Sequence, residues 1–171
     1  MEKFFNVNSS AEIVEKTQKY KDCVRIRCNI KKVENGYKYD ELVLTYDEYN
    51  NFTFEDYRKY YLEELERFIF DIRSNGIEYK DQLWSIDEDC EKNLTSQITL
   101  LSFAPTDKVS WFSKTQVNEL TIEEFKELAL VLSNAIANAK MKYYTYKNAI
   151  ERAETQEDLE AIIFEETDSE V

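Results

Sequence analysis

Three cysteines and close carboxylate pairs such as Asp87 and Asp89 are the side chains of this sequence that we consider as nucleophiles, bases or metal ligands. Histidine is absent from the 171 residues, so Ser/His and Cys/His nucleophile pairs cannot form. Cys23, Cys28 and Cys90 form no CxxC pair and cannot supply four zinc ligands without carboxylates. We therefore expect no metal, no cofactor, and reduced, mostly buried thiols in a cytosolic protein.

Asp87 and Asp89 are close enough in sequence to bind a metal or to work as an acid–base pair. Such pairs also arise by chance, because 35 of the 171 residues are Asp or Glu. The sequence contains no Gly-rich phosphate loop and neither a Walker nor a Rossmann fingerprint. It therefore predicts a protein that is not an enzyme and has no catalytic residue.

Basic residues are concentrated at the start of the chain, although the net charge is −13. Residues 1–33 carry a net charge of +4. Within them, Arg25, Arg27 and Lys31 share one face of an alternating stretch. This face is either the solvated side of a strand or a docking surface for an acidic partner, such as the C-terminus of another copy.

The end of the chain is acidic, and residues 151–171 carry a net charge of −8. This segment is either a solvated helix end or a surface that imitates nucleic-acid phosphates, with Glu157, Asp158 and Glu160 as contact residues. The negative net charge argues against direct binding to nucleic acid and against binding to anionic lipid. No apolar run approaches the ~20 residues of a membrane span.

The predicted helices and strands indicate an α+β fold with a basic N-terminal module. With only two Gly and one Pro, the composition favours long helices over a sandwich or barrel. A cap at Ser9 or Ser10 predicts a short helix through Lys19 with Ile13 and Val14 inward. Strands over 23–31 and 37–46 follow, joined at Asn35-Gly36 by a predicted type I′ turn.

The rest of the chain is predicted to be helical, with a second, small hairpin around Trp111. The predicted elements are a helix over 54–72 that stops at Asn75-Gly76, an extended segment over 77–84, a helix over 86–103 with Cys90, Leu94, Ile98 and Leu101 inward, a hairpin of 108–113 and 116–119, a helix over about 122–153, and a last short helix after Thr155 with Leu159, Ile162 and Ile163 inward.

The helix over 122–153 would be ~48 Å long, which exceeds the usual length in a compact domain. Tyr143 and Tyr144 lie in its C-terminal half and serve either in packing or in an oligomer or partner contact. The predicted division of the chain is a module over 1–50, a helical domain over 53–164 and a frayed acidic tail over 165–171.

Residues 60–163 resemble the C-terminal domain of unknown function found in phage and prophage tail-fibre and tail-assembly proteins. The shared pattern begins with the hairpin of Trp111 and the helix start at Leu120-Thr121. A long helix rich in Ala and aromatic residues follows, and the pattern closes with Ile150, Ala153, Thr155, Glu157, Leu159, Ala161 and Ile162. The family pattern names no catalytic residue.

The resemblance implies a phage- or prophage-encoded binding protein, either a tail or fibre component or an assembly factor. Its partner would be a tail or fibre protein, or a second copy of the chain, in the bacterial host cytoplasm or in the virion. A small, acidic chain without catalytic motifs is also typical of phage inhibitors of host nucleases, including anti-CRISPR proteins. The alternative is therefore an inhibitor that occupies the basic channel of a nuclease.

Overall fold

The computed structural model describes residues 1–10 and 16–165, and it has the predicted α+β class. The chain divides into two compact units. Unit 1 combines Met1–Leu65 with Tyr146–Val171, and unit 2 is Glu66–Thr145. These limits differ from the boundary predicted near residue 50, because two long helices each run from one unit into the other.

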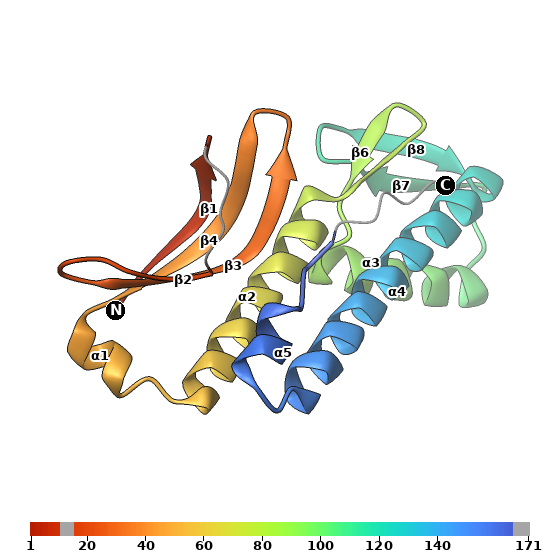
Figure 1. Cartoon of the computed structure of the whole chain (residues 1–171). Coiled ribbons are helices and arrows are strands. Elements are labelled where there is room, and N and C mark those ends of the chain that lie inside the picture. Colours follow the sequence, from red (N-terminus) through yellow and green to blue (C-terminus); the bar gives the residue numbers. More distant parts are fainter. Residues whose placement is uncertain (11–15, 166–171) are drawn as a thin grey trace. The chain divides into compact units, whose positions relative to one another are not determined.

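Unit 1 is built on an antiparallel four-stranded sheet of order β1-β4-β3-β2 (Figure 1). Its strands are β1 (Glu2–Ser9), β2 (Thr17–Lys19), β3 (Val24–Val33) and β4 (Gly36–Leu44). The predicted central hairpin, β3 with β4, is confirmed. The predicted type I′ turn is wrong, because Val33 pairs with Gly36 and Asn35 does not have a positive φ. Gly36 has a φ of 141°, and a Cβ there would lie 2.1 Å from the Ser9 carbonyl oxygen.

The predicted N-terminal helix is wrong in the parts that the structure describes. Ser9 ends β1, and Thr17–Lys19 form β2. Ile13 and Val14 lie outside the described residues. Strand pairing overrides the local cap signal, because these segments complete the ladders of β4 and β3, and such pairing depends on partners distant in sequence.

The first of the two long helices, α2 (Phe54–Asn75), confirms the helix predicted from residue 54. Thr53 and Asp56 cap its start, since the Thr53 hydroxyl accepts from the Asp56 N–H at 3.3 Å. Gly76, with a φ of 75°, ends it as predicted. Ahead of α2, the short helix α1 (Tyr46–Asn50) has a capping box between Thr45 and Glu48.

The second long helix, α4 (Ile122–Arg152), confirms the continuous helix predicted over about 122–153. The short helix α5 (Gln156–Glu160) follows, and Thr155 caps it as predicted. Leu159 is buried in unit 1, but Ile163 is 45% exposed, so its predicted inward position is wrong. The reason is that α5 ends at Glu160, and the residues beyond it do not continue its apolar face.

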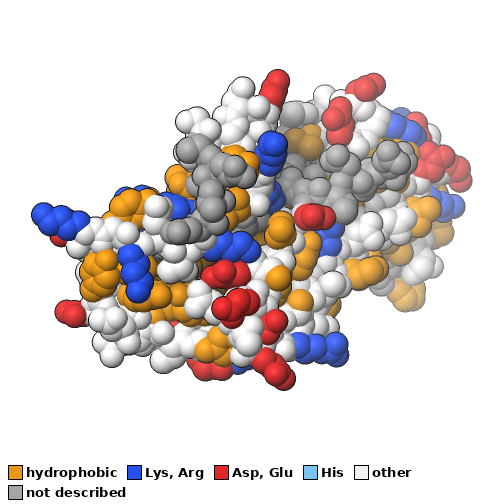
Figure 2. Space-filling model, viewed as in Figure 1, with side chains coloured by type: hydrophobic (Ala, Val, Ile, Leu, Met, Phe, Trp, Pro, Cys, Tyr) orange, Lys and Arg blue, Asp and Glu red, His pale blue; other side chains and the backbone are white. Residues whose placement is uncertain are grey.

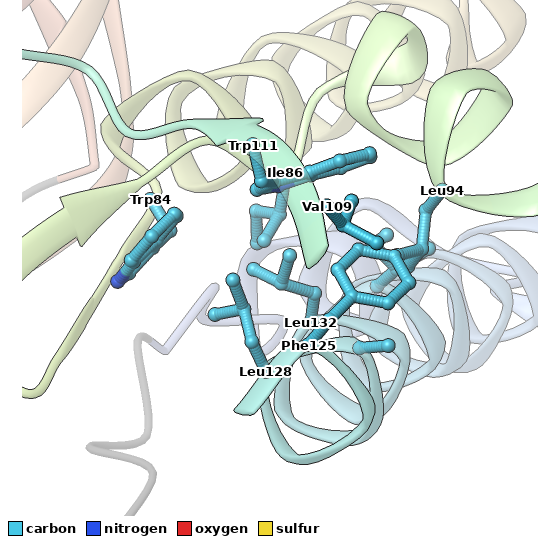
Figure 3. Packing of buried hydrophobic residues seen from close by; sticks show 10 residues of the cluster. Trp84, Ile86, Leu94, Val109, Trp111, Phe125, Leu128 and Leu132 are labelled. Atoms are coloured by element: carbon cyan, nitrogen blue, oxygen red, sulfur yellow. The ribbon is translucent and has the colours of Figure 1, made fainter. Parts of the chain in front are cut away.

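Unit 2 contains two hairpins and the helix α3 around one hydrophobic core. Its elements, besides parts of α2 and α4, are β5 (Ile77–Tyr79), β6 (Gln82–Trp84), α3 (Glu88–Phe103), β7 (Lys108–Phe112) and β8 (Val117–Thr121). The predicted second hairpin, β7 with β8, is confirmed. The core side chains come from α3, α4 and both hairpins, and Trp84, Trp111 and Phe125 are its largest members (Figure 3).

Helix α3 differs from its prediction at the start and on one face. Asp87 rather than Ser85 is the N-cap, and it accepts from the Cys90 N–H at 2.8 Å. Ile98 was predicted inward but is 48% exposed. The buried stripe instead steps from Leu94 through half-buried Gln97 to Leu101, which turns Ile98 toward solvent. None of the helices in the described part of the chain has the length and apolar character needed to cross a membrane.

Candidate functional site

A groove in unit 2 lies between one face of α3 and the β7–β8 hairpin, with a volume of about 520 Å³. We call it the α3–β7 groove. Its lining combines aromatic and aliphatic side chains with carboxylates, amides and hydroxyls. The lining residues are Ser85, Asp87, Asp89, Cys90, Asn93, Ser96, Gln97, Leu100, Ser110, Trp111, Phe112, Ser113 and Lys114. A concave site with a few convergent polar groups is the usual form of a binding site.

Both sides of the α3–β7 groove follow from local sequence periodicity. In β7, Val109 and Trp111 point into the core and Phe112 points outward, where it is 68% exposed. In α3, Asp89, Asn93 and Gln97 are spaced by four residues and share one helix face, which therefore lines the groove with polar groups.

Trp111 gives the α3–β7 groove a rigid aromatic base. Only 8% of its surface is exposed, and its ring packs on Phe125 with 5.4 Å between ring centroids. Because Phe125 belongs to the buried core of unit 2, this packing holds the indole of Trp111 in place. A ligand in the groove would therefore meet a preorganised surface.

Asp87 carries a negative charge at the α3 N-terminus. The Ser85 hydroxyl donates to its carboxylate, and so does the Cys90 backbone N–H. These hydrogen bonds hold the pKa of Asp87 below its ordinary value, with a smaller contribution from the Arg73 guanidinium. The carboxylate is therefore ionised across the neutral and mildly acidic range.

Cys90, the thiol of the α3–β7 groove, is poorly suited to act as a nucleophile. Burial raises its pKa to about 11, and the charges of Asp87 and Glu91 add to the effect while Arg73 opposes it. At neutral pH the thiol is protonated, and thiolate is the reactive form. This residue supports packing and the shape of the groove rather than chemistry.

Lys114 also lines the groove, but its ammonium group is engaged elsewhere in unit 2. It donates to the backbone oxygens of Ser74 and Asn75, the latter at 2.9 Å. It thereby satisfies carbonyls at the end of α2, where the helix dipole favours a cation. Its charge offsets the acidic side chains of the groove only in part.

Tyr143 and Tyr144, the tyrosines proposed for a partner contact, lie side by side on α4 in unit 2. Their rings make an edge-to-face contact with 5.4 Å between centroids. Tyr144 is 61% exposed, and Met141, one turn earlier, is 64% exposed. The surface around Met141 and Tyr144 is therefore apolar enough to contact a partner or a second copy of the chain.

The acidic contact residues proposed near the C-terminus lie on α5, where Figure 2 shows acidic side chains on the surface of unit 1. Glu157 is exposed. The pKa of Asp158 is lowered by its hydrogen bond with the Thr155 side chain and by the Thr155 and Glu154 backbone N–H groups, which donate to its carboxylate at 2.9 and 3.1 Å. Glu160 accepts from the Gln156 amide at 2.7 Å. Two of the three carboxylates therefore already stabilise α5.

Arg27, proposed for a basic docking surface, is buried instead. Its guanidinium donates to Glu41 at 3.0 Å, Gln18 at 2.9 Å and the Tyr20 hydroxyl at 3.1 Å. Arg25 also donates to Glu41, at 2.9 Å, and stays partly exposed. The prediction that this face of the strand is solvated is wrong for Arg27, because β2 and the residues that follow it bring polar partners onto this side of the sheet.

A second polar group in unit 1 was not found from the sequence. Cys28 on β3, Asp40 on β4 and Glu64 on α2 are all buried, and their ligand atoms lie within 4.8 Å of one another. Cys28 also donates to the Tyr60 hydroxyl at 3.4 Å. The sequence feature that could have indicated this group is Glu64, an acidic residue directly before Leu65 of the apolar stripe of α2.

The cluster of Cys28, Asp40 and Glu64 is the one group of three or more such side chains, within the described residues, that could hold a metal ion. One thiol with two carboxylates matches neither the Cys/His sets of structural zinc nor the all-oxygen sets of calcium and magnesium. We interpret it as a polar contact between the sheet and α2 within unit 1.

Comparison with known proteins adds no relative: no family model, no curated protein and no solved structure matches the chain.

Proposed function

We propose that this chain works without catalysis, by binding a protein partner through the α3–β7 groove. The observation that carries the proposal is the exposure of large apolar side chains that line this groove: Leu100 is 55% exposed and Phe112 68%. Large exposed side chains gathered at one place typically mark an interaction surface. Cys90, the one thiol of the groove, is held in its unreactive form.

The proposed partner is a tail or fibre protein of a phage or prophage, with this chain as a virion component or an assembly factor. The support is the resemblance of residues 60–163 to the tail domain, and the whole α3–β7 groove falls within that span. The apolar pair Met141 and Tyr144 on α4 gives a second surface for the partner or for another copy of the chain.

The test is co-purification with each tail and fibre protein encoded in the same phage or prophage genome. We expect one of them to bind in a salt-resistant manner, because the contacts are apolar. The variant Phe112→Ser should lose this binding, because Phe112 lines the groove. Leu130→Ser on α4 is the matched control, since Leu130 is 63% exposed but does not line the groove. Absence of binding to every tail and fibre protein would contradict the proposal.

The alternative is inhibition of a host nuclease by an acidic surface, and the exposed acids around α5 favour it. Glu151, Glu154 and Glu157 are exposed, whereas Asp158 is a helix cap. Charge reversal should therefore use Glu151→Lys, Glu154→Lys and Glu157→Lys and leave Asp158 intact. Salt-sensitive binding to a basic nuclease that disappears in this triple variant would support the alternative. Unchanged inhibition would remove it.

A further inference from the structure

We infer that the α3–β7 groove takes an extended peptide segment with a Lys or Arg side chain at one end and an apolar side chain at the other. This inference rests on the proposed function and specifies the part of the partner that enters the groove. Three features of the groove carry it: the amides of α3, the carboxylates near the N-terminal end of α3 and the apolar side chain of Leu100 near the C-terminal end of α3.

The amides of Asn93 and Gln97 are suited to a peptide backbone. Among the described residues, neither side-chain amide has a hydrogen-bond partner. Each carboxamide offers a donor and an acceptor together, as does each peptide unit of an extended chain. The two amides are one helical turn apart, about 6 Å along the axis. In an extended peptide, groups on the same side repeat every two residues, or about 6.6 Å.

The acidic end of the groove selects the charge of the segment. Asp87 and Asp89 both line it, and Asp89 is 88% exposed. Asp89 pairs with Lys92, whose ammonium lies 3.9 Å from the carboxylate and whose side chain is itself 70% exposed. Such an exposed pair is weak and is easily exchanged for a ligand cation. An acidic segment would instead meet repulsion here and from the net charge of −13.

The other end of the groove selects an apolar side chain. Leu100 lines it near the C-terminal end of α3, where it is 55% exposed, and the indole of Trp111, fixed by its packing on Phe125, forms the base of the groove. Asp89 and Leu100 are separated by about 16 Å along the axis of α3. An extended chain covers that distance in about five residues. The segment is therefore short, with its charged and apolar side chains four positions apart, because an even spacing puts both side chains on the same side of an extended chain.

The test is fluorescence anisotropy with labelled heptapeptides. One set carries Arg and Leu four positions apart, in both orders, joined by Ser and Gly; the second set has Glu in place of Arg. We expect the Arg peptides, in one order, to bind with a Kd below about 1 mM and the Glu peptides to bind at least about tenfold more weakly.

Variants of the groove residues test which side chains contact the peptide. Asn93→Ala/Gln97→Ala should weaken the binding of the Arg peptide about tenfold, the effect of losing two hydrogen bonds. Asp89→Asn should reduce the preference for Arg over Glu. Asn138→Ala is the matched control, because Asn138 is an exposed amide of α4 outside the groove.

Equal binding of the Arg and Glu peptides, or no binding of either set, would overturn this inference. The proposed function is judged separately by the Phe112→Ser variant against the full-length tail or fibre protein. If that protein binds through Phe112 while no heptapeptide binds, the proposed function stands and the peptide inference falls. If no tail or fibre protein binds but the Arg peptides do, the groove is a peptide site whose partner lies outside the tail.

Discussion

The two units of this chain use polar side chains in opposite ways. In the described residues, the buried charged side chains are Arg27, Asp40, Glu41 and Glu64, and all four belong to unit 1. In unit 2 the polar groups gather in the open α3–β7 groove, where Asn93 and Gln97 are exposed or half-buried. Buried polar side chains in unit 1 therefore serve the fold, whereas the polar side chains of the groove in unit 2 are available to a ligand.

The largest effect should come from breaking the buried ion pair of unit 1. Glu41→Ala leaves the Arg27 guanidinium buried without its carboxylate. We expect the free energy of unfolding to fall by about 3 kcal/mol, because an uncompensated buried charge is costly. Urea denaturation followed by circular dichroism measures the change.

Glu119→Ala in unit 2 is the matched control for Glu41→Ala. Glu119 pairs with Lys108 across the β7–β8 hairpin at 3.4 Å, but both side chains are more than 60% exposed. We expect a change within about 0.5 kcal/mol. Equal losses in the two variants would erase the distinction between structural polarity in unit 1 and available polarity in unit 2.

A smaller loss of stability should follow from Tyr60→Phe. This change removes the hydroxyl that accepts from Cys28 and leaves the ring in place. A buried group that loses its hydrogen-bond partner costs about 1–2 kcal/mol. Tyr144→Phe, at an exposed tyrosine of unit 2, should leave the unfolding free energy unchanged. A melting temperature of the parent protein that falls in EDTA would mean instead that a metal holds this cluster.

Most of the fold could be predicted from local sequence signals. The boundaries of α2 and α4 follow from capping residues and apolar stripes, and the hairpin of β3 and β4 follows from alternation. The N-terminal strands could not be predicted in this way, since β1 and β2 depend on pairing with strands far along the sequence. Arg27 was misplaced for the same reason: its partners come from two other segments, Gln18 with Tyr20 and Glu41.

The α3–β7 groove was only half visible in the sequence. The hairpin of Trp111 was recognised, and the helix beside it was predicted with Leu94 inward. The groove itself requires α3 and β7 to lie side by side, and no local pattern specifies that packing. Ile98 shows the limit, since periodicity placed it inside and the actual packing turns it outward.

A further test of the comparison is the pH dependence of Asp87, a carboxylate with both a structural role and a place in the groove. Its pKa is lower in the folded protein than in the unfolded chain, so its contribution to stability is present above about pH 4 and is lost as the pH falls through the lower, folded pKa. Asp87→Ala should therefore cost about 1 kcal/mol at pH 7, through the lost cap, and less at lower pH.

Asp87→Asn separates the two roles of this residue. Asn is about as good an N-cap as Asp, so most of the stability at pH 7 should remain while the charge is gone. Thermal melts of both variants between pH 7 and pH 2 measure the effect. A stability gap between Asp87→Ala and the parent protein that stays constant over this range would show that the ionised carboxylate contributes nothing to the cap.

The smallest expected effect on stability is that of Phe112→Ser, and it bears most directly on the role of unit 2. Phe112 is 68% exposed and lies on the outer face of β7, opposite Val117 in the hairpin register. Its removal exposes no core surface, so the unfolding free energy should change by less than about 0.5 kcal/mol. Partner binding should nevertheless fall. A loss of stability above about 1 kcal/mol would show that the ring supports the fold of unit 2, and the groove would then resemble the buried polar clusters of unit 1 in serving the structure alone.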